Sequence, residues 1–168
     1  MDNLQKISSI KFISSLASLL LVCFIIFQNL PSNIYENMLD LSFGFDTFSV
    51  ERTFESLGAL GRKQYVYAAL ILDTIFPFLY AFLLIAVLIR LDEARVLILC
   101  IPILAAVFDL FENIAISLMM TSPSLELITT TQIFYGSLFN QLKWVFLTVT
   151  VVIIFFKLCI IFLSKVNK

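Results

Sequence analysis

The sequence contains no histidine, and charged residues make up only 14% of its 168 positions. Without histidine, the chain cannot be a histidine-dependent phosphatase or a rhomboid-type protease. No basic run is present and the net charge is −1, which argues against a nucleic-acid partner because such a partner needs a clustered basic face. The three cysteines, Cys23, Cys100 and Cys159, lie in apolar runs without C-x-x-C spacing. We interpret them as small buried hydrophobic residues rather than metal ligands.

Hydrophobic residues are abundant instead, at 61% of the chain, which is more than a soluble core uses. Because about 20 helical residues cross a bilayer, the long apolar stretches predict an all-α, four-span transmembrane helix bundle that forms a single integral membrane domain over residues 1–168. The predicted spans are about 10–28, 66–89, 96–119 and 131–163. The last stretch exceeds one straight crossing, so we expect 144–163 to be the crossing proper. No A-x-A-like site follows the first span, which we expect to be retained as a signal anchor.

The distribution of lysine and arginine predicts the orientation of the bundle. Six of these residues lie on the side that holds both termini and the "RLDEAR" turn, against three on the opposite side. The positive-inside rule therefore places both termini in the cytoplasm, in the cell or inner membrane if the protein is bacterial. Residues 29–65 then form an extramembrane capping loop between the first two spans. Within it we expect a short helix that Ser49 caps and that Gly58 or Gly61 ends.

Strongly polar residues interrupt the apolar spans at regular positions. In "FDLFENIAI", the side chains of Asp109, Glu112 and Asn113 fall within one quadrant of a helix. In "LDTIFPFLY", Asp73 and Tyr80 share a stripe with a proline. The last span presents Asn140 and Lys143 on one face, and Arg62 or Lys63 of the loop could reach down toward them.

Charged groups that face lipid are costly, so we expect these polar faces to converge inside the bundle. The predicted cluster comprises Asp73, Tyr80, Asp109, Glu112, Asn113, Asn140 and Lys143, with Arg62 as support. The carboxylates outnumber the lysine, so protons, a bound cation or a loop arginine must offset the excess charge. No metal site is predicted with certainty, although Asp73, Asp109 and Glu112 could hold Mg²⁺ or Mn²⁺ through their oxygens.

Two prolines lie within the predicted spans. Pro77 cannot donate the backbone hydrogen bond that would reach the carbonyl of Asp73, so a freed backbone oxygen and a carboxylate are expected side by side. Pro77 and Pro102 are also candidate hinges. Tyr65, next to the second span, is expected to be an anchor at the membrane interface.

The pattern supports several functions, and the first hypothesis is structural. In it, the cluster holds the helix bundle together or docks a protein partner, which could be a second copy of the chain in a homodimer. The alternatives are an intramembrane enzyme that acts on a lipid or lipid-linked substrate, with Asp73, Asp109 and Glu112 as candidate catalytic residues, and a transporter of protons or small solutes. The sequence lacks the motifs of CDP-alcohol phosphotransferases, prenyltransferases and signal peptidase II, which argues against the hypothesis of an intramembrane enzyme.

A wider succession of motifs links these residues. Gly61-Arg62-x-x-Tyr65 is followed by Asp73-x-x-Phe76-Pro77-x-x-Tyr80, then Asp109-x-x-Glu112-Asn113 and Leu142-Lys143-Trp144. Over roughly residues 50 to 145, the chain resembles a group of small, uncharacterised four-helix integral membrane proteins that carry the same succession. The resemblance implies an architecture and a set of residues, and it implies no activity.

Overall fold

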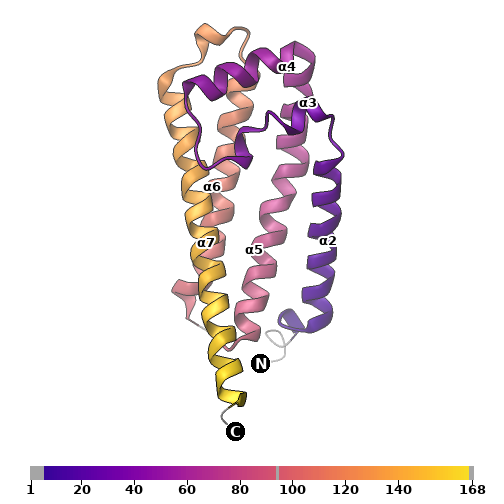
Figure 1. The fold of residues 1–168 in the computed structure, drawn as a ribbon, viewed down its shortest axis with the longest axis vertical. Coiled ribbons are helices and arrows are strands. Elements are labelled where there is room, and N and C mark those ends of the chain that lie inside the picture. The colour runs from indigo at the N-terminus through magenta and orange to yellow at the C-terminus, as the bar shows by residue number, and fades with distance from the viewer. Residues whose placement is uncertain (1–5, 94, 167–168) are drawn as a thin grey trace.

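The computed structural model describes residues 6–93 and 95–166. Four long helices form a bundle, as predicted, and each is long and apolar enough to cross a membrane (Figure 1). They are α2 (Ile10–Gln28), α5 (Asp73–Arg90), α6 (Val96–Met120) and α7 (Thr130–Val166). The bounds of α2 and α6 agree with the predicted spans to within a residue, because long apolar runs mark such helices locally.

The second span is longer than the sequence suggested. The part of helix α4 (Thr47–Tyr67) that follows Gly58 runs into a π-helical turn, η2 (Ala68–Leu72), and on into α5. Gly58 has non-helical backbone angles, φ 57° and ψ −174°, so it ends the first helical part of α4, as predicted, and a second helical part follows it. The cap also differs from the prediction, because Asp46 rather than Ser49 is the N-cap and accepts a 2.9 Å bond from the Ser49 amide.

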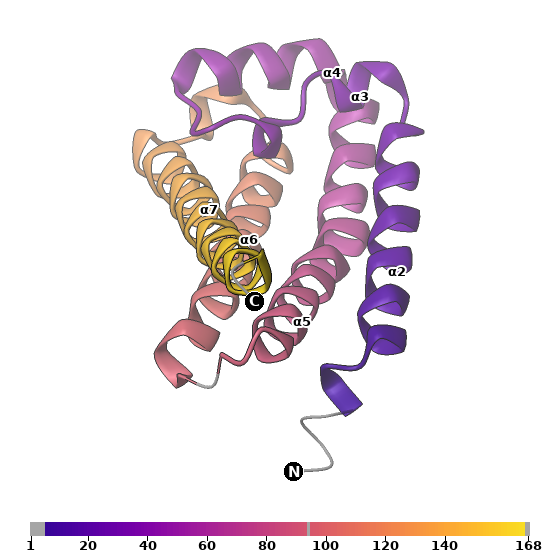
Figure 2. The ribbon, with the colours of Figure 1, turned by 60° about the horizontal axis from the view of Figure 1, so that its bottom comes forward.

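The segment predicted as a capping loop is a folded cap. Helix α4 lies across the end of the bundle opposite the chain termini (Figures 1 and 2). Beneath it lie two short elements, α3 (Ser32–Tyr35) and the 3₁₀ turn η1 (Leu39–Leu41). Ile34, Val50 and Met119 are among the buried side chains that join the cap to α6 in one apolar core. The cap is therefore fixed on the bundle by burial of apolar surface.

The four long helices are packed unevenly. Helix α6 packs against both α5 and α7, whereas α2 packs against α5. The rings of Phe108 and Phe146 stack between α6 and α7 with centroids 5.5 Å apart. Leu16 is the one buried residue of α2, so most of this helix is not covered by protein.

The end of the bundle near the termini carries its own ionic contact. Glu93, in the turn between α5 and α6, is 3% exposed. Its carboxylate accepts bonds of 2.7 and 2.9 Å from the Arg95 guanidinium and pairs with Lys157 of α7 at 3.1 Å. The hydrogen bonds from Arg95 and the nearby Lys157 hold the pKa of Glu93 well below its ordinary value. This turn is thereby joined to α7.

Candidate functional site

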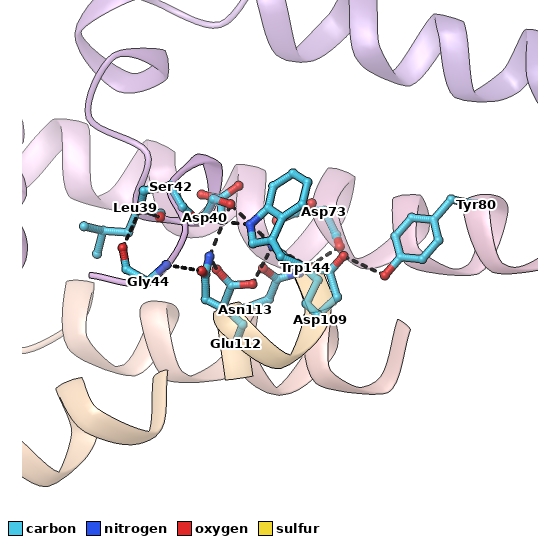
Figure 3. A network of polar contacts seen from close by, with 12 residues as sticks. Leu39, Asp40, Ser42, Gly44, Asp73, Tyr80, Asp109, Glu112, Asn113 and Trp144 are labelled. Atoms are coloured by element: carbon cyan, nitrogen blue, oxygen red, sulfur yellow. Dashed lines mark hydrogen bonds and ion pairs between the residues drawn. The ribbon is translucent and has the colours of Figure 1, made fainter. Parts of the chain in front are cut away.

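The residues that the sequence placed on polar faces do converge. The set drawn from α5, α6 and α7 lies just beneath the cap (Figure 3), and no member is more than 7% exposed. It comprises Asp73, Tyr80, Asp109, Glu112, Asn113, Asn140 and Lys143. The helical period alone predicted this inward orientation, because it fixes which side chains share a face.

Lys143 is the central cation of the cluster. Its ammonium nitrogen lies 2.5 Å from Glu112 Oε2 and 3.4 Å from Asp109 Oδ1. It also donates to the backbone oxygen of Asp40 in η1 at 3.4 Å. One side chain of α7 therefore links two carboxylates of α6 to the cap.

Asn140, one helical turn before Lys143, completes this link. Its amide nitrogen donates to Glu112 Oε1 at 2.7 Å and to the backbone oxygen of Asp40 at 3.4 Å, while its oxygen accepts a 2.6 Å bond from the Gly44 amide. Glu112, Asn140 and Lys143, with the backbone of η1 that they bind, are called the anchored half of the cluster below. Its polar groups are paired, and they hold the cap on the bundle.

Asp40 is the member that the sequence interpretation missed. It is 6% exposed, and its Oδ1 accepts a 2.8 Å bond from the hydroxyl of Tyr65. The same hydroxyl accepts the Leu39 amide at 2.8 Å, so Tyr65 is a buried support of η1 rather than an interface anchor. The only available signal was an isolated charge within the apolar segment "NMLDLSFGF".

The backbone oxygen of Asp73 is engaged as the proline suggested. Pro77 is buried within the continuous helix α5 and cannot donate to that oxygen. The amide nitrogen of Asn113 donates to it instead, at 2.8 Å. Asn113 Oδ1 and the nearby Ser117 hydroxyl are buried on α6 without a hydrogen-bond partner among the described residues.

The remaining members face a cavity. The Tyr80 hydroxyl donates a 3.0 Å bond to Asp109 Oδ2. Asp73 is only 6% exposed. Its carboxylate nevertheless forms no hydrogen bond or ion pair within residues 6–93 and 95–166. Asp73, Tyr80 and Asp109 are called the cavity half of the cluster.

The cavity holds about 200 Å³ and is partly open. Residues of α2, α5, α6, α7 and the cap line it. Its lining is aromatic and aliphatic over a polar floor, and consists of Phe24, Phe27, Tyr35, Asp40, Leu41, Asp73, Phe76, Tyr80, Asp109, Lys143, Trp144 and Leu147. The cavity thus reaches from side chains of α2 to the cluster.

Arg62 lies apart from the cluster, contrary to its predicted supporting role. Its guanidinium donates to the backbone oxygen of Ser122 at 2.9 Å and lies 3.5 Å from the centre of the Phe54 ring. Arg62 therefore contacts the turn after α6 rather than the cluster. Pro102 is buried inside the unbroken helix α6, and a hinge role for either proline stays a prediction.

No group of three or more carboxylates or cysteines in the described ranges is arranged to hold a metal ion. Lys143 occupies the position between Asp109 and Glu112 where a bridging cation would lie. The divalent cation at Asp73, Asp109 and Glu112 stays a prediction. No protein-family model, curated protein or solved structure matches the chain.

Proposed function

We propose that the chain is an integral membrane protein that binds an amphiphilic molecule in the cavity between α2 and α7. The observation that carries the proposal is the Asp73 carboxylate, buried and unpaired on the floor of a cavity with apolar walls. Ligand pockets have this character, with mostly apolar linings and a few placed polar groups. A purely structural cluster would pair every member, since an unpaired buried charge costs stability.

The proposed entry route is lateral, from the lipid. Phe24 on α2 and Leu147 on α7 belong to membrane-spanning helices and line opposite flanks of the cavity. The start of α2 and the end of α7 lie at the end of the bundle away from the cap (Figure 1). With the positive-inside rule, that end is cytoplasmic and the cavity opens in the outer half of the bilayer.

For the anchored half, we retain the hypothesis that the cluster holds the helix bundle together. Glu112, Asn140 and Lys143 join α6, α7 and η1 through hydrogen bonds and ion pairs. In this proposal they fix the cap over the cavity, and the cavity half meets the ligand. The cluster is thus both the polar contact that holds the bundle and the floor of the binding site.

The proposal stops at binding and does not extend to catalysis or transport. General acid–base chemistry needs two groups free to exchange protons with the reacting molecule. Asp109 is already engaged by Tyr80 and Lys143, and Glu112 by Asn140 and Lys143. Asp73 alone is free to act on a bound molecule.

Native mass spectrometry of protein extracted from cell membranes tests the proposal. The wild type should retain a bound amphiphile, and Leu147→Trp should lose it because the larger ring fills the cavity. Leu158→Trp is the matched control, since Leu158 is an exposed residue of the same helix, and it should retain the amphiphile. Equal retention by both variants would overturn the proposal, as would a wild type that carries nothing and takes up no added lipid or detergent.

A further inference from the structure

The charges around the cavity are unbalanced. Four buried carboxylates, those of Asp40, Asp73, Asp109 and Glu112, lie near a single ammonium, that of Lys143. Lys143 is directed toward Glu112 and Asp109, and the Asp40 carboxylate accepts the Tyr65 hydroxyl. Asp73 is left without a partner in the described ranges, on the cavity floor. An incoming cation would find an unused acceptor there.

The walls of the cavity suit a weakly hydrated cation. Six aromatic side chains line it, namely Phe24, Phe27, Tyr35, Phe76, Tyr80 and Trp144. The rings of Phe27, Phe76 and Tyr80 pack edge to face, with centroids 5.9 and 5.8 Å apart. Faces of aromatic rings attract alkylammonium groups, most strongly where water is excluded. The cavity therefore offers a cation two attractions, one from the Asp73 carboxylate and one from the faces of the aromatic rings.

The size of the cavity restricts what can enter. At about 200 Å³ it is smaller than the roughly 300–1,000 Å³ of pockets that enclose a whole drug-sized ligand. It holds a head group and the first part of a chain, and the remainder must lie along α2 and α7 in the lipid. An anionic head group would be repelled by the carboxylates, and an uncharged one could donate a hydrogen bond to Asp73 without bringing a compensating charge.

We propose that the ligand is a cationic amphiphile whose ammonium group pairs with Asp73 beneath the cap. This inference rests on the proposed function and names its ligand class. The ammonium lies among the aromatic rings, and the chain leaves between Phe24 and Leu147. Lys143 remains bound to Glu112 and Asp109 and keeps the floor in place.

The test uses the full chain in dodecyl maltoside micelles, with Trp144 emission as the readout. Trp144 is the one tryptophan of the sequence and lines the cavity. The probe is dodecyltrimethylammonium, and the matched uncharged probe is octaethylene glycol dodecyl ether, which has the same chain length. The cationic probe should bind at least about tenfold more tightly, as expected for Coulomb attraction to Asp73 and cation–π contacts where water is excluded. Asp73→Asn should remove most of that preference, whereas Glu126→Gln, at an exposed position, should keep it.

Equal affinity for the two probes would overturn the inference, and so would an unchanged preference in Asp73→Asn. If the uncharged probe binds as well and Leu147→Trp blocks both probes in native mass spectra, the cavity still binds amphiphiles and only the cation is wrong. If neither probe binds, the proposed function fails too. Competition by dioleoylphosphatidylcholine would support the ammonium of a lipid headgroup as the source. Absence of competition, with the cationic preference intact, would support a free cationic amphiphile.

Discussion

The side-chain amide of Asn113 on α6 donates a 2.8 Å hydrogen bond to the backbone oxygen of Asp73 on α5. That oxygen lacks its helical donor because Pro77 stands four residues later. The proline thus creates an acceptor inside the bundle, and the neighbouring helix satisfies it. This contact fixes the start of α5, where the Asp73 side chain turns toward the cavity.

Replacing Asn113 by alanine should destabilise the protein by about 1–3 kcal/mol, because a buried carbonyl loses its donor. The penalty should be smaller when Pro77→Ala is also present, since the new backbone amide can bond the same oxygen. A double-mutant cycle on thermal unfolding in detergent measures this coupling. Additive effects of the two substitutions would contradict the relationship between Pro77 and Asn113.

Lys143→Met should be strongly destabilising, by about 3–5 kcal/mol, because it leaves Glu112 and Asp109 buried without their cation. Glu112 has no exposed surface, and its Oε2 lies 2.5 Å from the ammonium. Lys63→Met removes an exposed lysine of the cap and should change stability by no more than about 0.5 kcal/mol. Unfolding midpoints in detergent compare the two variants, and similar midpoints would show that the ion pairs do not hold the bundle.

Asp73→Asn should leave stability unchanged or increase it, in contrast to Lys143→Met. Its carboxyl group has no partner among the described residues, so replacing it by the similarly sized neutral amide breaks no contact. Binding sites commonly carry such an unpaired group, at a cost in stability, for the sake of function. A clear loss of thermal stability in Asp73→Asn, measured without ligand, would assign Asp73 to the anchored half instead.

Gly44→Ala should loosen the cap. Gly44 has a φ of 77°, and an added Cβ would lie 2.5 Å from Gln141 Nε2. The strain and the displaced Asn140 bond should together cost about 1–3 kcal/mol. Gly58→Ala is the matched control, because Gly58 also has a positive φ of 57° but nothing lies within 4 Å of the added atom. Limited proteolysis of residues 29–65 should be faster in Gly44→Ala than in Gly58→Ala, and equal rates would refute the close contact.

Glu93 should give the turn between α5 and α6 a dependence on acid pH. Its folded pKa lies below its ordinary value of 4.5 because Arg95 and Lys157 stabilise the carboxylate. A lowered folded pKa contributes stability that is complete above the unfolded pKa and is lost as the pH falls through the folded pKa. The difference in unfolding midpoint between wild type and Glu93→Gln should therefore be constant above about pH 5 and shrink below it. A difference that grows on acidification would contradict this sign.

The sequence by itself determined the four long apolar helices and the inward polar faces. The apolar run that forms α2 and the period that groups Asp109, Glu112 and Asn113 are local properties. The Pro77 effect on the Asp73 oxygen also followed locally, because the missing donor lies one turn away. Each of these features depends on residues close together in the chain.

Only the tertiary structure decided what lies above the cluster. Asp40 meets Asn140 across 100 residues, and no helical period connects the two. Helix α4 carries Arg62 away from the bundle and Tyr65 into it, because its path follows the bend at Gly58 and the apolar core of the cap. The cavity lies where α2, which packs on α5, and α7 contribute side chains around the cluster. Packing between segments that are distant in the sequence set the positions of Asp40, Arg62 and Tyr65 and formed the cavity. Local sequence patterns do not predict such packing.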